Sequence, residues 1–374
     1  MKDFRSPIET FPCLHPRAST GCGRFGCNAA RAALLALAIM LPAKSYSADG
    51  PVQLNVVGGL AGVSQYTRFE EPFWTRQIEQ LSNGRLRAEI QPFDRSGLPG
   101  PEMLQLMRLG VVPYGTALLA LVAGDDPELN AVDLPALNPD MASLRKNVEL
   151  YRPYLHQVLQ DKYDIELLGI YTYPAQVLFC TKPFKGLNDL AGRRVRTSSV
   201  GQSEMMTALA AKPVLTPFAN IVDAVRTGSV DCAITGTLSG NEIGLSDVTS
   251  YVHVMAISWG LSFFGANEAA WHMLPSDLRA TLRNGIRGLE QGIWSAADGE
   301  TEEGLACDTG SAECRGGHPS HMVLVPVTPE DRAARTRLLV NSVLPAWVGR
   351  CGAECADAWN HTIGPELGIT VDRN

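Results

Sequence analysis

Residues 186–235 read GLNDLAGRRVRTSSVGQSEMMTALAAKPVLTPFANIVDAVRTGSVDCAIT, and this stretch decides the fold class. Short strands are predicted at residues 194–197, 213–215 and 230–234, and apolar residues recur at helical spacing between them. Strand, helix, strand, helix, strand is a βαβαβ unit. Such a unit implies an α/β fold with a parallel sheet that binds ligands beyond the carboxyl ends of its strands.

Arg196 lies near the carboxyl end of the first of these strands. The guanidinium group carries a fixed fork of donors, which suits a carboxylate held by two parallel charge-assisted hydrogen bonds. The 374-residue chain has a formal net charge of −7, so an anion would need a local positive site. Arg196 is therefore the candidate anion ligand, and a surface ion pair is the alternative interpretation.

The order of motifs in this stretch resembles the solute-binding subunits of the tripartite (TRAP) transporters for organic acids. The matching residues are GRRVRT at 192–197, AKPV at 211–214, Phe218, and TGSVDCAI at 227–234. The resemblance covers about residues 53–347. It implies two α/β lobes with a ligand cleft between them, a long helix that braces both lobes, and Arg196 as the main ligand for the substrate carboxylate.

The predicted fold is therefore a two-lobed periplasmic binding protein fold of type II-like topology. We expect a signal peptide at residues 1–47. The first lobe is assigned to residues 48–173 together with approximately 255–374, which include the bracing helix and the C-terminal segment. The second lobe is assigned to residues 174–254.

The amino-terminal segment has the features of an export signal. Three arginines (Arg17, Arg24 and Arg31) precede an apolar run at residues 32–41, which is too short to span a bilayer. Ser45 and Ser47 supply small residues at the −3 and −1 positions, so cleavage is expected after Ser47. No later segment reaches 18 uninterrupted apolar residues, so we expect a periplasmic chain that is not embedded in a membrane.

The resemblance also indicates polar ligand contacts around the cleft. Gln176 occupies a position where relatives commonly have a second arginine, and its neutral amide favours a ligand with one carboxylate. Thr235 stands where sialic-acid-binding relatives place an asparagine, and Ser199 offers a further hydroxyl. The turn GGLAGVSQY at residues 58–66 would place Gln65 and Tyr66 on the cleft wall of the first lobe.

Two aromatic residues are candidates for covering the carbon skeleton of the ligand. Phe218 lies at a family position that favours ligand packing. Trp259, in AISWGLSFFGAN, can stack on an apolar part of the ligand, or it can be a core tryptophan under the hinge. The sequence leaves both alternatives open for Trp259.

Six of the nine cysteines remain after Cys13, Cys22 and Cys27 leave with the signal, and an even number in an exported chain suggests disulfides. Cys307 with Cys314, and Cys351 with Cys355, form two local motifs for which pairing within each motif is preferred. A clip between the two motifs and a zinc site with His318 and His321 are the alternatives. On the family's cleft geometry, Cys180 and Cys232 lie at similar depth on two strands, so they form a disulfide or remain buried thiols.

We find no set of catalytic residues typical of an enzyme in the sequence. It contains no G-x-S-x-G or H-E-x-x-H motif, and the adjacent acids Glu70-Glu71 and Asp125-Asp126 are expected to be solvated. No cofactor or metal is indicated, and the negative charge makes nucleic acid an unsuitable partner. We expect a monomeric receptor that passes a small organic acid to TRAP permease subunits. A secreted enzyme acting on a small carboxylic acid and a receptor feeding a sensor kinase are the alternatives.

Overall fold

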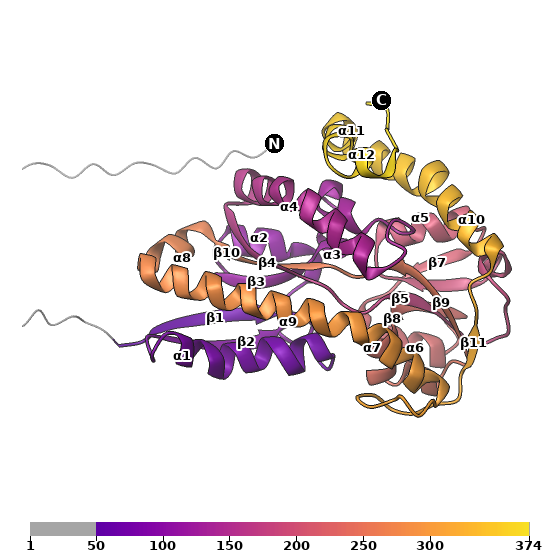
Figure 1. The fold of residues 1–374 in the computed structure, drawn as a ribbon, viewed down its shortest axis with the longest axis horizontal. Coiled ribbons are helices and arrows are strands. Elements are labelled where there is room, and N and C mark those ends of the chain that lie inside the picture. The colour runs from indigo at the N-terminus through magenta and orange to yellow at the C-terminus, as the bar shows by residue number, and fades with distance from the viewer. Residues whose placement is uncertain (1–49, 374) are drawn as a thin grey trace, which may run out of the picture. The chain divides into compact units, whose positions relative to one another are not determined.

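The structure, a computed structural model, describes residues 50–373. The predicted signal peptide, its cleavage site after Ser47 and the three cysteines that precede that site lie outside the described residues. Within the described chain, two β-sheets are flanked by helices (Figure 1). This arrangement agrees with the predicted two-lobed α/β fold.

The first sheet has the strand order β2-β1-β3-β10-β4. Strand β1 pairs in parallel with β2 and β3, and β10 runs antiparallel between β3 and β4. The strands are β1 (Val52–Gly58), β2 (Leu86–Pro92), β3 (Tyr114–Leu118), β4 (Ile165–Tyr171) and β10 (Ser262–Asn267). Most of this sheet comes from the amino-terminal part of the chain, and β10 returns to it after strands β5 to β9 of the second sheet.

The second sheet has the strand order β11-β9-β5-β8-β6-β7. Strand β6 pairs in parallel with both β7 and β8, which confirms the predicted βαβαβ unit, whereas β5 runs antiparallel to β8 and β9. The strands are β5 (Gln176–Cys180), β6 (Arg194–Thr197), β7 (Lys212–Leu215), β8 (Cys232–Gly236), β9 (Tyr251–Ser258) and β11 (Val323–Val325). Strand β11 pairs with β9, a contact that the predicted lobe boundaries did not include.

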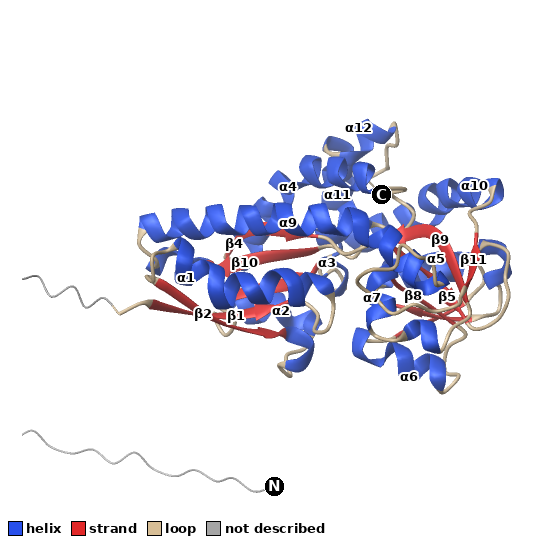
Figure 2. Cartoon of the chain, turned by 60° about the horizontal axis from the view of Figure 1, so that its bottom comes forward, coloured by secondary structure: helices blue, strands red, loops and turns tan. Residues whose placement is uncertain are grey.

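The helices cover the faces of the two sheets, as Figure 2 shows. They are α1 (Ile78–Leu81), α2 (Met103–Arg108), α3 (Leu119–Val122), α4 (Met141–Tyr163), α5 (Val200–Ala208), α6 (Ile221–Arg226), α7 (Thr237–Glu242), α8 (Glu268–Met273), α9 (Ser276–Thr309), α10 (Pro329–Leu338), α11 (Leu344–His361) and α12 (Ile363–Leu367). No helix in residues 50–373 combines the length and the hydrophobicity that crossing a bilayer requires.

Helix α9 is the long helix that the sequence predicted, and it contacts elements of both lobes. The indole of Trp294 donates to the carbonyl of Ile170 in β4, while Gly304 packs directly on the backbone of α7 beside Leu238. A side chain at position 304 would collide with that backbone, which explains the glycine. Pro275 is the residue that precedes the first helical turn, and no side chain caps that turn.

Helix α4 is continuous from Met141 to Tyr163, although it contains Pro153. A proline inside a helix removes one backbone hydrogen bond, but the other turns of α4 are retained. Several side chains along one face of this helix, including Leu144, Tyr151 and Leu155, are fully buried. The burial of this face offsets the loss at Pro153.

Three disulfides are formed in the described chain. Cys180 and Cys232 join the adjacent antiparallel strands β5 and β8, with 4.1 Å between their Cα atoms. The other two pairs are local, Cys307 with Cys314 and Cys351 with Cys355. The local Cys307–Cys314 pairing is confirmed, and so is the Cys180–Cys232 disulfide that the sequence left open. A clip between the two motifs, a zinc site on Cys307 and Cys314, and free thiols at Cys180 and Cys232 are therefore wrong.

Candidate functional site

Three predicted site residues lie at one edge of the second sheet. Strands β6 and β8 are parallel and β5 is antiparallel to β8, so the carboxyl ends of β6 and β8 meet the amino end of β5. Gln176, the first residue of β5, is in register with Gly236, and Arg196 is in register with Ala233. Thr235 lies between these two levels on β8. The topology therefore brings Arg196, Thr235 and Gln176 to the edge at which α/β proteins bind ligands.

The guanidinium of Arg196 is buried, with 3% of the residue exposed. Its Nε donates to the carbonyl of Thr216 at 2.9 Å, and its Nη1 donates to the carbonyl of Ile234 at 2.6 Å. No carboxylate in residues 50–373 forms an ion pair with Arg196, and burial lowers the pKa of its guanidinium to about 9. The group is therefore still charged at neutral pH, and it lacks a counter-ion within the described chain.

The side-chain amide of Gln176 is held by two neighbours. Its Oε1 accepts a hydrogen bond from Gln202 Nε2 at 2.7 Å and another from Ser258 Oγ at 2.9 Å. Its Nε2 lies against Gly260, where a Cβ atom would be only 2.5 Å away. Gly260 also has a φ of +77°, a conformation that glycine adopts without strain. The amide of Gln176 thus has a defined position beside the hinge segment.

Phe218 lies in the segment that connects β7 to α6 in the second lobe, but it packs against residues of the first lobe. It is partly buried against a small apolar cluster formed by Leu60, Val63, Phe93 and Tyr173. A polar contact also joins the two sides, because the backbone N–H of Ser64 donates to the carboxylate of Glu242 in α7 at 3.2 Å. The predicted aromatic contact at Phe218 therefore lies where the two lobes meet.

Gln65 and Tyr66 follow the glycine-rich turn, but they lie in different surroundings. Gln65 is buried beside Gly59, and the same glycine lies next to the hydroxyl of Tyr173. Tyr66 instead packs against Gly58, and its hydroxyl is 3.5 Å from the carbonyl of Ile90 in β2. The structure thus places Gln65 next to Tyr173 of the interlobe cluster and places Tyr66 over β1 and β2.

Ser199 and Trp259 have structural partners. Ser199 is the N-cap of α5, and its hydroxyl accepts from the backbone N–H of Gln202 at 3.1 Å. Trp259 is 4% exposed and belongs to the main core, where its indole N–H donates to the carbonyl of Asn138 at 3.1 Å. Of the two alternatives for Trp259, this position matches that of a core tryptophan.

Glu70 was expected to be solvated, and that expectation is wrong. It is fully buried, and its carboxyl group accepts from the backbone N–H of Gly59 at 2.6 Å and from Gln65 Nε2 at 2.7 Å. Burial raises its pKa to about 7. Helical spacing contained the missing signal, because Glu70 precedes the buried Phe73 and Trp74 by three and four residues. The carboxyl group holds the glycine-rich turn in place.

Asp126 was also expected to be solvated, yet it is 9% exposed and accepts from the hydroxyl of Tyr163. The local sequence is polar and proline-rich, so it gave no sign of burial. Tyr163, at the end of α4, supplies the partner from 37 residues away. This contact fastens a loop of the first lobe and has no role at the edge of the second sheet.

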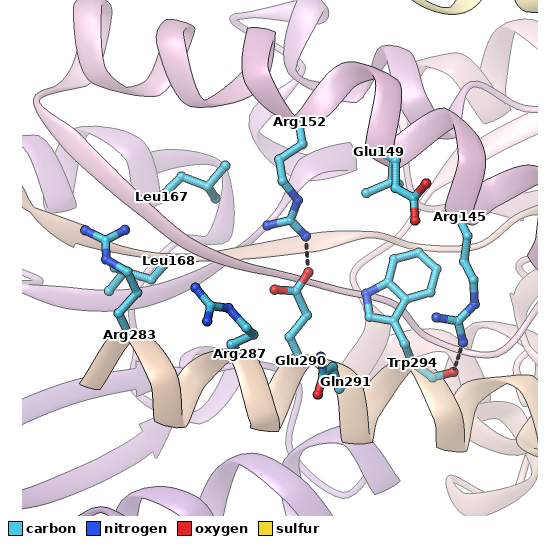
Figure 3. A pocket seen from close by; sticks show the side chains of 11 residues that line it. Arg145, Glu149, Arg152, Leu167, Leu168, Arg283, Arg287, Glu290, Gln291 and Trp294 are labelled. Carbon is cyan, nitrogen blue, oxygen red and sulfur yellow. Dashed lines mark hydrogen bonds and ion pairs between the residues drawn. The ribbon is translucent and has the colours of Figure 1, made fainter. Parts of the chain in front are cut away.

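A pocket away from this edge lies between α4 and α9 (Figure 3). It has a volume of about 490 Å³, and none of the predicted site residues lines it. Its arginines are largely engaged, since Arg152 pairs with Glu290 and Arg145 donates to the carbonyl of Trp294. These contacts join the two helices over β4, so the groove accompanies the packing of α4 on α9.

Comparisons with known proteins agree on one family. Residues 64–311 match the family model described as bacterial extracellular solute-binding protein, family 7. A comparison with curated protein sequences found no match. Among solved structures, a Bordetella pertussis extracytoplasmic solute receptor binding pyroglutamic acid has a TM-score of 0.73 and 23% identity, over 83% of this chain and 99% of that one.

Two further solved structures show the same fold. A TRAP periplasmic solute-binding protein from Desulfovibrio salexigens, with bound orotic acid, has a TM-score of 0.73 and 16% identity, over 82% of this chain and 96% of that one. A counterpart from Rhodoferax ferrireducens, with bound malonate, has a TM-score of 0.71 and 20% identity, over 84% and 99%. These proteins are receptors, and the family consists of binding proteins rather than enzymes.

Proposed function

The chain belongs to family 7 of the bacterial extracellular solute-binding proteins, and from this membership we propose that Arg196 receives the carboxylate of a small organic acid. The bound acid lies at the edge of the second sheet, between the two lobes. The protein then delivers it to TRAP-type membrane permease subunits. Pyroglutamic acid, orotic acid and malonate, which the similar structures hold, are all carboxylic acids, and this supports the class of ligand.

The observation that carries the proposal is the uncompensated charge of Arg196. Its guanidinium is buried and fixed by two backbone carbonyls, which orient the group but do not neutralise it. Keeping such a charge away from water is costly unless an opposite charge pairs with it. A ligand carboxylate supplies this charge, and the fork of the guanidinium matches its geometry.

Other predicted residues complete the proposed contacts. Gln176, Ser199 and Thr235 offer hydrogen-bond donors at or near the same edge, Phe218 covers the carbon skeleton, and Gln65 contributes from the first lobe. Tyr66 and Trp259, which have structural partners, stand behind this surface. A ligand that touches both lobes shifts the equilibrium towards the closed arrangement, which the permease would recognise.

The proposal extends to the location and organisation of the protein. We assign residues 1–47 to a signal peptide that is removed on export to the periplasm. The lobes are assigned to residues 48–173 with 255–374, and to residues 174–254, with β11 attached to the second sheet. The mature receptor acts as a monomer, because its ligand contacts come from the two lobes of one chain.

A thermal-shift screen of the mature protein tests this function. The panel contains mono-, di- and hydroxy-carboxylates and aromatic acids. A ligand at about 100 times its Kd stabilises the folded state by roughly 2.7 kcal/mol, which raises the Tm measurably. We expect a shift with one class of acid, none with Arg196→Ala, and a weak one with Arg196→Lys, because a point charge cannot reproduce the fork. An unchanged shift in Arg196→Ala would contradict the assignment.

A further inference from the structure

The orientation of the amide of Gln202 is fixed by a backbone group. The N–H of Ser198 donates to Gln202 Oε1 at 2.8 Å, and a backbone N–H can only donate. The hydroxyl of the same serine donates to this oxygen as well, at 3.1 Å. Gln202 is 1% exposed, so its amide cannot satisfy itself with water. Its Nε2 must therefore point away from Ser198 as a donor.

The fixed orientation of the Gln202 amide in turn fixes the orientation of the Gln176 amide. Gln202 Nε2 has two hydrogens, and it donates one to Gln176 Oε1 at 2.7 Å and the other to Ser258 Oγ at 2.9 Å. The hydroxyl of Ser258 then donates its own hydrogen to Gln176 Oε1 at 2.9 Å. The hydrogens of Gln202 Nε2 and of Ser258 Oγ all have acceptors, so the oxygen of Gln176 faces Gln202 and Ser258. Its Nε2 is left as the outward group.

We propose that this relay, running from Ser198 through Gln202 and Ser258, makes Gln176 a fixed neutral donor that selects ligands carrying an uncharged hydrogen-bond acceptor besides their carboxylate. The inference rests on the proposed function, because it concerns the same ligand. Gln176 Nε2 donates to no group in residues 50–373, and Gly260 leaves room for it. Gln202 and Ser258 act as positioning residues.

The strand register places the two donors on opposite faces of the sheet. Arg196 is in register with Ala233, and Ala233 with Phe179, so these three side chains share a face. Gln176 precedes Phe179 by three residues and belongs to the other face, on which α5 supplies Gln202. A ligand across the edge therefore meets a cation from one side and a neutral amide from the other. A second carboxylate would have no cation opposite it.

The substrate class follows from this asymmetry. A ring or amide carbonyl, or a hydroxyl, accepts from Gln176 Nε2 without leaving a charge buried and unpaired. A second carboxylate at the same place would also accept, but it would lose its hydration without gaining a counter-ion. The preferred ligand is a monocarboxylate with a neutral acceptor, and dicarboxylates of similar size are selected against.

Calorimetric titration of the mature protein with pyroglutamate and with malonate tests the inference. Pyroglutamate has one carboxylate and a neutral ring carbonyl, whereas malonate has two carboxylates. We expect the wild type to bind pyroglutamate at least about tenfold more tightly, because the second carboxylate of malonate would be buried without a charged partner. The informative variant is Gln202→Glu, whose second carboxylate oxygen requires donors and so turns Gln176 Nε2 away from the edge.

We expect Gln202→Glu to lower the pyroglutamate-to-malonate affinity ratio by about tenfold. The matched control is Asn147→Asp. Asn147 is also a buried amide that donates to another amide, Asn138, in the first lobe, and the same chemical change there should leave the ratio unaltered. A second variant, Ser258→Ala, removes one of the two donors to Gln176, and we expect it to fold and to lower the ratio by about threefold.

The outcomes distinguish a failure of the relay from a failure of the proposed function. A lowered ratio in Gln202→Glu and Ser258→Ala, with Asn147→Asp unchanged, supports the relay. Wild-type preference for malonate, or an unchanged ratio in Ser258→Ala, overturns it while leaving the carboxylate receptor intact, provided that binding still requires Arg196. Absence of binding to every carboxylate of the thermal-shift panel overturns both the relay and the proposed function.

Discussion

Arg196 in the second lobe and Glu70 in the first are both buried without an oppositely charged partner among residues 50–373, and the two groups behave differently. In the second lobe, Arg196 is fixed by two backbone carbonyls, and burial lowers its pKa only to about 9. In the first lobe, Glu70 is fixed by the N–H of Gly59 and the amide of Gln65, and burial raises its pKa to about 7. Both groups lie near the meeting point of the lobes.

The difference lies in how each group can lose its charge. Glu70 can take up a proton near neutral pH, and it then holds the glycine-rich turn as a neutral carboxyl group. Arg196 cannot lose its proton under the same conditions, so its charge persists until an anion arrives. The comparison therefore assigns a structural role to the buried acid and a ligand-binding role to the buried base.

The largest effect is expected from Arg196→Met. Affinity for the preferred acid should fall by at least about 100-fold, because a desolvated carboxylate loses its charged partner. The ligand-free variant should be no less stable than the wild type, since replacing an unpaired buried charge by an apolar chain of similar length relieves a cost. Calorimetric titration and denaturant unfolding measure the two quantities.

The matched control for this variant is Arg194→Met. Arg194 is two residues earlier on the same strand, but it is partly exposed and pairs with Asp231. Its replacement should leave ligand affinity within about twofold of the wild type. Equal losses in the two variants would show that general disturbance of β6, not the carboxylate contact, explains the result.

Removal of the Cys180–Cys232 disulfide should have the next largest effect. The bond closes a loop of 52 residues, and its loss should lower the free energy of unfolding by about 2–4 kcal/mol. This variant tests a difference between the two regions. Strands β5 and β8 beside Arg196 are joined by a disulfide, whereas the glycine-rich turn held by Glu70 is not. Urea unfolding of Cys180→Ala/Cys232→Ala gives the value.

The pair Cys307→Ala/Cys314→Ala serves as its comparison. It opens a loop of only 7 residues, so the chain-entropy model predicts a smaller loss of stability. A larger loss of stability in Cys307→Ala/Cys314→Ala than in Cys180→Ala/Cys232→Ala would show that the Cys180–Cys232 disulfide contributes little to the stability of the second sheet.

Glu70→Gln tests whether the buried acid of the first lobe takes up a proton in the folded state. Because the folded-state pKa of Glu70 is raised, its contribution to stability is present in full below pH 4.5 and is lost as pH rises through about 7. The wild type should therefore lose on the order of 2–3 kcal/mol between pH 5 and pH 8 that Glu70→Gln does not lose. Unfolding curves at several pH values measure this difference.

Glu71→Gln, one residue further along and exposed, provides the control and should keep the wild-type pH profile. Parallel pH profiles for the wild type and Glu70→Gln would mean that Glu70 does not take up a proton in the folded state. The contrast between the acid and the base would then be lost.

The smallest effect is the alkaline dependence of binding. The complex requires a protonated Arg196, and the pKa of this group in the free protein is lowered to about 9. Affinity should be constant from pH 6 to pH 8 and about fourfold weaker at pH 9.5. Titrations in matched buffers test this, and constant affinity up to pH 10 would show that the free guanidinium is not depressed.

Local patterns sufficed for part of the account. The βαβαβ unit could be predicted because its strands and helices are consecutive, and Arg196 because its motif lies within that unit. The relay behind Gln176 could not, since Gln202 and Ser258 are 26 and 82 residues away and meet Gln176 only after the sheet forms. Glu70 was misjudged because charged residues are usually exposed and its neighbours Gly59 and Gln65 surround it only in the folded turn.

A crystal structure of the mature protein with a bound acid from the screen would show directly whether Arg196 holds the carboxylate. We expect both carboxylate oxygens to lie about 3 Å from nitrogens of Arg196, at the edge of the second sheet. A ligand whose carboxylate lies away from Arg196, for example in the groove between α4 and α9, would contradict it.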